Sequence, residues 1–556
     1  MKKINLKLFS LFLFFVSDML FAYENMIQNQ VNLEQDKIER ENNKRNEQKS
    51  IPKTILEIEV IAEIEKTKTD TLNCFNIEKT ILKLDIELLP PKEIYEKLNG
   101  KCVNVEDIQL LMSDINKFYQ ENNLITTRVY VPEQNLKNKE LNLVVLNGKL
   151  SGYAYADGSG VDYRLLNAFP IEIGETINLR ELEQGVDNFN RLQSQKGKMK
   201  LVPAQNQGES YLIMEQQQTK PWNAKIGVDN SGYETTGRYK ALGSFSYDNL
   251  LNLDDNINID YSTNLDDEDN KKRANSGSLN YSVPYGDWLY SYSHSRHIFH
   301  RIIQGVNQQY YVNGFSDSDT LGLNRSIYRD QSARVNLYGK LSIKESKNYI
   351  EHYEIETQRR NLTILDIGIS GDDVIENTSI SYDLGVKFGL NILNGMEDIP
   401  GLAESKTKTL HSKISLKLPF DEDNYSFNSD LGGQYSEYEL AGSEQFGIGG
   451  RYDVRGFHED NLYGNSGIYL RNEIETKNFT NEGLKIRYFL GFDVGAVKKS
   501  ATINWSDKEL AGISTGARFS ITEYLSGDLT ISKAIKRPEE FEASKEQVYF
   551  NINFKF

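Results

Sequence analysis

The last twelve residues of the chain, 545–556, read K-E-Q-V-Y-F-N-I-N-F-K-F. Apolar and polar residues alternate through this stretch up to the terminal aromatic residue. Successive side chains of a β-strand point to opposite faces, so the alternation predicts a strand with one polar and one apolar face. The apolar face contains Val548, Phe550, Ile552, Phe554 and Phe556. Such a strand is typical of a transmembrane β-barrel, in which lipid covers the outside and water fills the inside.

A second stretch, residues 484–497, repeats this pattern as L-K-I-R-Y-F-L-G-F-D-V-G-A-V. Its charged residues Lys485, Arg487 and Asp493 all fall on the predicted inward face. The predicted outward face contains Leu484, Ile486, Tyr488, Leu490, Phe492, Val494 and Ala496. In residues 467–476, Arg471 and Glu473 likewise fall on the polar face. Strands that carry charge on only one face indicate a barrel with a wet lumen.

Short alternating segments follow one another from Trp222 to the end of the chain, separated by Gly, Asn, Asp and Ser. We therefore assign residues 220–556 to a transmembrane β-barrel of about 16 antiparallel strands, since bacterial barrels of this kind have an even number of strands. The chain contains 32 Tyr and 25 Phe. This aromatic content suits the girdles that such barrels place at both membrane interfaces.

The N-terminus has the features of a signal peptide, which we place at residues 1–22. A basic region with Lys2, Lys3 and Lys7 precedes an apolar run from Leu8 to Val16, and cleavage at a small residue is expected at Ala22. The run is too short to span a membrane as a helix. Mean hydropathy is −0.55. A membrane protein without spanning helices must cross the bilayer as a closed barrel.

Charge and cysteine content narrow the possible partners and the compartment. The net charge of −16 disfavours nucleic acid as a partner. The two cysteines, Cys74 and Cys102, are 28 residues apart in the chain. In an exported protein such a pair is expected to form a disulfide. Two reduced, buried thiols are the alternative.

Three segments precede the barrel. Residues 23–52 are rich in charged and amide side chains, and their apolar residues are too sparse for a core-facing helix stripe. This segment is either a solvated linker or a helix lodged in a polar cavity. Residues 53–148 contain a linker and a small α/β unit with a predicted helix at 105–122. Residues 149–219 repeat the α/β theme, with a predicted helix from about Leu179 to Gln193.

No group of residues predicts catalysis, a metal or a cofactor. His294, His297 and His300 are spaced like metal ligands, but a spacing of three on a strand places neighbours on opposite faces. Only His294 and His300 can share a face, too far apart to bind one ion. The chain contains no phosphate-binding glycine motif, and an enzyme is not expected.

The most specific constellation is the sequence G-G-R-Y-D-V-R-G-F at residues 449–457. Its glycines, between two strand-like segments, predict a loop. Asp493 is predicted to point into the lumen between Gly491 and Gly495, where no bulky side chain shields it. A loop folded into the lumen could bring Arg455 to this carboxylate, and a two-pronged arginine–carboxylate contact would fix the loop. Alternatively, Arg455 is an exposed loop residue and Asp493 only hydrates a pore.

Several motifs in order resemble those of the haemolysin secretion/activation proteins, the outer-membrane transporters of two-partner secretion. The resemblance extends from about residue 24 to the end of the chain. V-R-G-F, at Val454, Arg455, Gly456 and Phe457, looks like the hallmark loop of that family, and F-D-V-G at 492–495 looks like its strand counterpart. V-R-G-F alone is also found in the wider superfamily that includes barrel insertases. The other matching segments are C-F at 74–75, G-K-C at 100–102, T-R-V-Y-V-P-E-Q at 127–134, D-N-S-G at 229–232, T-G-R-Y at 236–239, Y-S-V-P-Y-G at 281–286 and L-R-N-E at 470–473.

The resemblance implies a protein translocator in the outer membrane of a Gram-negative bacterium. Two periplasmic POTRA domains, small α/β units found in this family, would capture an unfolded exoprotein through its N-terminal secretion domain. The barrel would conduct the exoprotein outward without nucleotide hydrolysis, the N-terminal helix would plug the resting pore, and the V-R-G-F loop would lie in the lumen. Phe556 is expected to act as the C-terminal signal for the barrel-assembly machinery. The remaining expected partner is outer-membrane lipid.

Two other functions stay open from the sequence. A barrel-assembly insertase is related, but usually has a different number of POTRA domains and no plug helix. A passive porin would not need POTRA domains. An enzyme displayed on a barrel is a more distant alternative.

Overall fold

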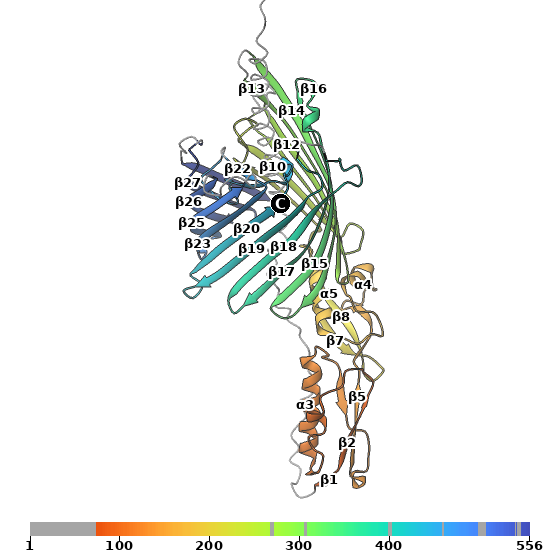
Figure 1. Ribbon diagram of the computed structural model, residues 1–556. Coiled ribbons are helices and arrows are strands. Elements are labelled where there is room, and N and C mark those ends of the chain that lie inside the picture. The colour runs from red at the N-terminus through yellow and green to blue at the C-terminus, as the bar shows by residue number, and fades with distance from the viewer. Residues whose placement is uncertain are drawn as a thin grey trace, which may run out of the picture.

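The computed structural model describes residues 74–266, 272–304, 308–398, 403–458, 461–498, 508–539, 541 and 546–556. The signal peptide predicted at residues 1–22 and the plug helix predicted within residues 23–52 lie outside these residues. The chain forms two α/β units in a row followed by a large barrel (Figure 1). We call the barrel edge that faces the α/β units the proximal rim.

The first α/β unit packs one long helix against a small sheet. Its sheet has the strand order β2-β5-β4, and β1 pairs separately with β3. Helix α3 begins after Asn104, which exchanges hydrogen bonds with Asp107 in a capping box. Its buried residues lie at helical spacing: Leu111, Ile115 and Tyr119. The elements are β1 (Phe75–Ile77), β2 (Lys79–Leu84), α2 (Lys92–Tyr95), β3 (Lys101–Val103), α3 (Val105–Glu121), β4 (Arg128–Tyr130), a 3-10 turn (Leu136–Asn138) and β5 (Glu140–Leu146).

A disulfide joins Cys74 to Cys102, with 5.3 Å between their Cα atoms. The predicted disulfide is therefore confirmed, and the alternative of two reduced thiols is wrong. The bond ties the residue before β1 to strand β3. Because β3 leads directly into α3, the bond fixes the start of the long helix.

The second α/β unit contains β6 (Lys149–Tyr155), α4 (Tyr163–Ala168), α5 (Leu179–Asn190), β7 (Gln195–Pro203) and β8 (Glu209–Gln218). Its sheet has the order β6-β8-β7. Helix α5 was predicted and is present, while α4 was missed because six residues are too few to show a helical period. The core of this unit includes Leu165 of α4, Phe189 of α5 and Leu212 of β8, all fully buried.

The barrel is closed and antiparallel, and 16 long strands form its wall among the described residues. The predicted strand number of about 16 is confirmed. The long strands are β9 (Trp222–Asp229), β10 (Lys240–Asp248), β11 (Asn256–Asn264), β12 (Arg273–Tyr285), β13 (Trp288–Gln304), β14 (Gln309–Arg329), β15 (Ala333–Ile350), β17 (Arg360–Ile375), β18 (Thr378–Leu390), β19 (Lys408–Phe420), β20 (Tyr425–Ser436), β23 (Ser466–Thr476), β25 (Leu484–Lys498), β26 (Glu509–Ile521), β27 (Leu525–Lys536) and β28 (Gln547–Lys555). Short strands β16 (Tyr353–Glu354) and β24 (Phe479–Asn481) extend two of the turns. Strands β21 (Phe446–Ile448) and β22 (Leu462–Gly464) pair in a separate two-stranded sheet that is not part of the barrel wall. Two further 3-10 turns lie at Glu356–Gln358 and Gly442–Glu444.

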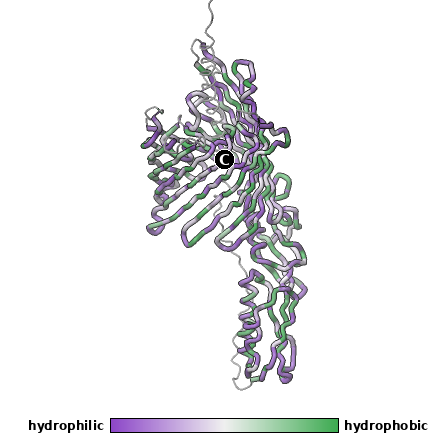
Figure 2. Tube along the Cα trace, in the orientation of Figure 1, coloured by the Kyte–Doolittle hydropathy of each residue, from purple (hydrophilic) through white to green (hydrophobic). Residues whose placement is uncertain are grey.

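The barrel strands alternate as their sequences predict. In β25, Leu490 and Phe492 are exposed on the outer surface, whereas Phe489 and Asp493 are buried. Figure 2 shows hydrophobic and hydrophilic residues alternating along the barrel strands. The register places Arg471 of β23 directly opposite Asp493 of β25. None of the helices in the described part of the chain is long and apolar enough to span a membrane.

The barrel closes where the last long strand meets the first. β28 pairs with β9 from Asn551 opposite Asp229 to Lys555 opposite Lys225. The backbone N–H of the terminal residue, Phe556, adds a hydrogen bond of 2.9 Å to the carbonyl of Ala224. The C-terminal stretch that predicts the barrel therefore also seals it.

Helix α5 joins the second α/β unit to the proximal rim. Arg191, which follows α5, donates to the Ser282 hydroxyl at 2.8 Å and to the Asp254 carbonyl at 2.6 Å. The Arg329 guanidinium lies 2.5 Å from the Asp187 carboxylate, and both side chains are largely buried. These contacts link α5 and the residue after it to the β10–β11 turn and to strands β12 and β14, so the unit is held in a defined position next to the barrel.

Candidate functional site

The predicted loop at residues 449–457 is folded against the inner wall of the barrel, between β21 and β22. Asp453 organises its backbone, because its Oδ1 accepts hydrogen bonds from the N–H groups of Gly449, Gly450 and Val454 at 2.7, 2.8 and 2.6 Å. We call residues 449–458 the luminal loop. A single carboxylate therefore fixes the turn that presents Arg455.

Two apolar residues of the V-R-G-F motif anchor the luminal loop by burial. Val454 and Phe457 are both almost completely buried. They belong to one apolar cluster with Ile448, Leu462, Tyr469, Val497 and Leu510. Burying one such side chain stabilises a fold by about 1.5–3 kcal/mol. The loop is thus held by packing on both sides of the arginine.

Arg455 forms the two-pronged contact with Asp493 that the strand register predicts. Arg455 Nε lies 2.6 Å from Asp493 Oδ2, and Nη2 lies 2.7 Å from Oδ1. The backbone N–H of Arg455 also donates to Asp493 Oδ2 at 3.2 Å. Relative exposure is 1% for Arg455 and 0% for Asp493. The alternative of an exposed loop arginine is therefore wrong.

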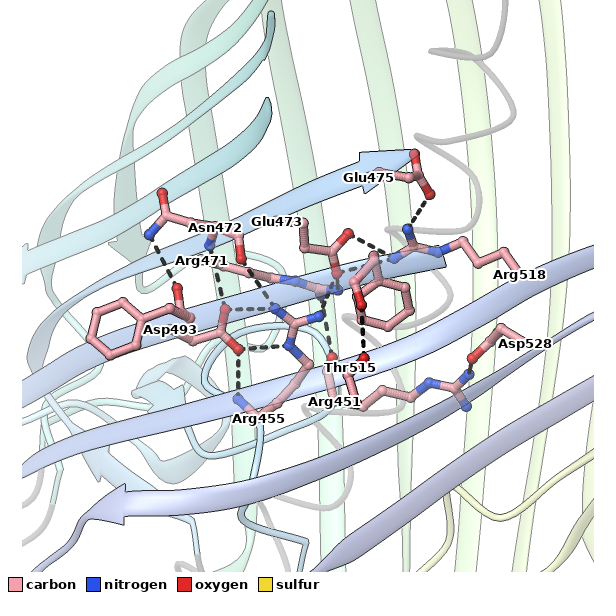
Figure 3. A network of polar contacts seen from close by, with 12 residues as sticks. Arg451, Arg455, Arg471, Asn472, Glu473, Glu475, Asp493, Thr515, Arg518 and Asp528 are labelled. Atoms are coloured by element: carbon pink, nitrogen blue, oxygen red, sulfur yellow. Dashed lines mark hydrogen bonds and ion pairs between the residues drawn. The ribbon is translucent and has the colours of Figure 1, made fainter. Parts of the chain in front are cut away.

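The two other predicted lumen charges, Arg471 and Glu473, join the same network (Figure 3). The Glu473 carboxylate accepts from Arg455, from Arg471 at 2.9 Å and from Arg518 at 2.8 Å. Arg518 also pairs with Glu475. Because Glu473 bridges three guanidinium groups, it links the luminal loop to strands β23 and β26. Arg518 and Glu475 were not singled out from the sequence.

Glycines in the wall make room for the luminal loop. A Cβ atom at Gly491 would lie 2.3 Å from Arg455 Nη2, and one at Gly512 would lie 1.8 Å from the Arg455 carbonyl oxygen. A Cβ atom at Gly495 would lie 2.9 Å from Val454. Gly456 has a φ of +107° and faces the β27 backbone, where a Cβ atom would lie 2.7 Å from Ala534 N. The motif glycine is therefore required by both conformation and space.

The luminal loop also reaches the strands where the barrel closes, which sequence reasoning missed. Arg451 Nη2 lies 2.6 Å from Asp528 Oδ2 of β27. The Tyr549 hydroxyl of β28 donates to the Phe457 carbonyl at 3.2 Å. His458 Nε2 lies 2.8 Å from the carbonyl of Gly232, in the segment after β9. The only sequence signal for these contacts is the inward position of Asp528 and Tyr549 on alternating strands.

The three histidines with ligand-like spacing lie against separate partners. His294 Nδ1 is 3.0 Å from Asp319, His297 Nδ1 is 2.7 Å from Ser276, and His300 Nδ1 is 2.9 Å from Tyr311. Among the described residues, no group of three or more His, Cys, Asp or Glu side chains is arranged to hold a metal ion.

Comparisons with known families agree with this architecture. The model of the haemolysin secretion/activation protein family ShlB/FhaC/HecB matches residues 208–519, more than half of the chain. A POTRA domain of the ShlB type matches residues 83–148, and a further POTRA domain matches residues 149–203. These two matches fall on the first and second α/β units.

Relatives of similar length carry related names. The chain is 26% identical over 461 residues to the outer membrane transporter CdiB of Dickeya dadantii (strain 3937), with 82% of each chain covered. It is 29% identical over 449 residues to the hemolysin transporter protein ShlB of Serratia marcescens, with 78% of this chain and 77% of that protein covered.

Solved structures share the fold. The structure of CdiB from Escherichia coli matches with a TM-score of 0.85 at 22% identity and covers 95% of this chain and 99% of that chain. CdiB from Acinetobacter baumannii matches with a TM-score of 0.77 at 21% identity, covering 96% and 99%. With the family model spanning most of the barrel and POTRA matches preceding it, the chain belongs to the haemolysin secretion/activation protein family, the outer-membrane transporters of two-partner secretion.

Proposed function

We propose that this transporter captures one unfolded exoprotein in the periplasm with residues 53–219 and releases it outward through the barrel of residues 220–556. The observation that carries the proposal is that two POTRA sheets, each ending in two edge strands, stand in series next to the proximal rim, which is the periplasmic rim in this proposal. The first sheet ends in β2 and β4, and the second in β6 and β7. An extended chain can add to such an edge through backbone hydrogen bonds, whatever its side chains.

The proposal divides the mature chain into three working parts. Residues 53–148 and 149–219 form the two capture domains, and residues 23–52 plug the resting pore. Transport needs no cofactor and no nucleotide, because folding of the exoprotein outside the cell prevents its return. The chain is a transporter rather than an enzyme in this proposal. Outer-membrane lipid and the barrel-assembly machinery, which would read Phe556, are the other partners.

The luminal loop has a positioning role in this proposal. Val454, Arg455, Gly456 and Phe457 hold it against the wall, Asp493 is its charged anchor, and Arg471 and Glu473 complete the network. The buried ion pair fixes one loop position, because removing either charge would leave the other without compensation. A fixed loop keeps a defined channel along the wall formed by β23, β25 and β26.

Deletion of residues 74–218 tests the capture step. We expect secretion of its exoprotein to stop, while the barrel still inserts and still shifts in gel mobility on heating. Secretion by the deletion variant would contradict the proposal. An insertase would instead show loss of other outer-membrane barrels when the whole protein is depleted. Deletion of residues 23–52 tests the plug, since it should raise single-channel conductance in planar bilayers.

A further inference from the structure

Helix α4 of the second POTRA domain has an apolar face that the domain core does not use. Leu165 and Ala168 are fully buried in the core. Tyr163 and Leu166 project from the helix with relative exposures of 67% and 42%, and Val161 just before it is 44% exposed. Exposed apolar side chains grouped on one short helix mark an interaction surface. We call Val161, Tyr163 and Leu166 the α4 patch.

The α4 patch is fixed next to the periplasmic rim. The N–H of Gly286, in the turn between β12 and β13, donates to the Asn167 carbonyl at 2.8 Å. The Asn188 side chain of α5 donates to the carbonyls of both Ala168 and Gly286 at 2.7 Å. The patch therefore lies within about one helical turn of a direct backbone contact with the barrel. In Figure 1, α4 lies beside the lower edge of the barrel wall, far from α3.

The turn that holds α4 carries exposed aromatic side chains on the outer face of the barrel. Tyr285 precedes Gly286, is 61% exposed and pairs across the turn with Trp288. Tyr290 follows on the same outer face of β13 and is also exposed. The guanidinium carbon of Arg325, on β14, lies 5.1 Å from the centre of the Trp288 ring. Tyr and Trp beside a basic residue are typical of the level at which a barrel meets lipid headgroups.

We propose that the α4 patch inserts into the headgroup region of the periplasmic leaflet and continues the aromatic belt of the barrel onto the second POTRA domain. The occupant is phospholipid, because the patch adjoins the outer wall of an outer-membrane barrel at exposed Tyr side chains and a Trp side chain of the kind found at the headgroup level. Tyrosine suits such a position, since its ring is apolar and its hydroxyl can stay hydrated. An extended exoprotein segment is less suited to α4, because a helix offers no free strand edge.

A fluorescent probe on single cysteines tests this contact in the full-length protein. The variants are Tyr163→Cys, Leu166→Cys and the control Leu110→Cys, each labelled with an environment-sensitive dye. Leu110 is a matched control because it is 61% exposed but lies on α3 of the first POTRA domain. The proteins are placed in nanodiscs of phosphatidylethanolamine and phosphatidylglycerol, with and without lipid that carries a doxyl quencher near its headgroup. Each variant must first show the heat-dependent gel shift of a folded barrel.

The expected result is a blue-shifted emission at positions 163 and 166 in nanodiscs relative to detergent, and severalfold stronger quenching there than at position 110. Equal quenching at all three positions would overturn the proposal. A probe at position 163 that is not quenched by the doxyl lipid, but changes its emission when the purified secretion domain of the exoprotein is added, would also overturn the proposal. The patch would then be a cargo-binding surface.

Discussion

Arg455 of the luminal loop and Asp493 of β25 meet through two side-chain hydrogen bonds of 2.6 and 2.7 Å, and both side chains are almost completely buried. Such a pair is costly to break on one side only, because the remaining charge stays buried at a cost of about 3–5 kcal/mol. We therefore expect Arg455→Ala to reduce secretion per inserted barrel more than it reduces insertion. Secretion assays normalised to heat-modifiable protein measure this. Lys485→Ala, an exposed charge on the same strand, is the control and should secrete normally.

Exchanging the two charges should not restore function. In the variant Arg455→Asp with Asp493→Arg, the new carboxylate at position 455 would face Glu473, which accepts a hydrogen bond from Arg455 in the native protein. Two carboxylates that share one buried site repel each other, and the shorter aspartate cannot restore the contact that arginine makes with Glu473. We expect the double variant to secrete no better than either single variant. Substantial rescue would show that Glu473 is not a partner of the loop in the membrane.

The glycine wall can be tested without changing any charge. Gly512→Ala would place a methyl group 1.8 Å from the Arg455 carbonyl, so it should displace the loop backbone and reduce secretion. Gly339→Ala is the matched control, because a Cβ atom at that barrel position has no neighbour within 4 Å. A cysteine pair at positions 455 and 493 should crosslink with a short reagent in the control background. The same pair should crosslink poorly in the Gly512→Ala background.

The Cys74–Cys102 disulfide should stabilise only the first POTRA domain. Replacing both cysteines with serine should lower the free energy of unfolding of that domain by about 2–4 kcal/mol, since the bond closes a 28-residue separation. Limited proteolysis of the full-length protein should show faster cleavage within residues 74–148. Cleavage of the barrel should be unchanged, and accelerated cleavage there would contradict a local role.

Glu181 on α5 should make the second POTRA domain sensitive to pH. Burial, followed by repulsion from Glu175 and Asp287, raises the pKa of Glu181 from 4.5 to about 7. The folded domain thus keeps a proton that the unfolded chain releases, so stability should fall as pH rises between about 4.5 and about 7. Glu181→Gln should remove this dependence and add on the order of 1 kcal/mol at neutral pH, after allowing for partial exposure. Thermal unfolding at both ends of this pH range measures the effect. The exposed residue Glu93 provides the control, because Glu93→Gln should leave the unfolding profiles unchanged at both pH values.

The sequence was sufficient to predict which wall residues face inward, because side-chain direction in a strand depends only on position. It was not sufficient to predict the complete network. Glu473 and Arg518 meet only because β23 and β26 both border β25, and pairing among strands is a property of the closed barrel. Contacts of Arg451 with β27 depend likewise on where the loop lies. Local sequence patterns thus predict the face of a strand on which a side chain lies, whereas contacts between residues far apart in the chain depend on how the strands pair in the closed barrel.

Short elements were also beyond sequence reasoning. Helix α4 has only six residues, and its exposed Tyr163 and Leu166 weaken the usual signal of a buried stripe. Its position depends on hydrogen bonds from Gly286, which lies 119 residues after Asn167 in the chain. The disulfide was predictable for the opposite reason, because an exported chain with two cysteines has one possible pairing.

The contacts of the luminal loop imply an order of events during biogenesis. The loop precedes β23, β25, β27 and β28 in the chain, yet its arginines bind carboxylates on β23, β25 and β27, and Phe457 accepts from Tyr549 of β28. Its remaining anchor, Gly232, belongs to the first hairpin. The full set of loop contacts is therefore complete only once the final strand has joined the first. Loop docking is thereby a late step, and its completion distinguishes a finished transporter from an open, partly inserted sheet.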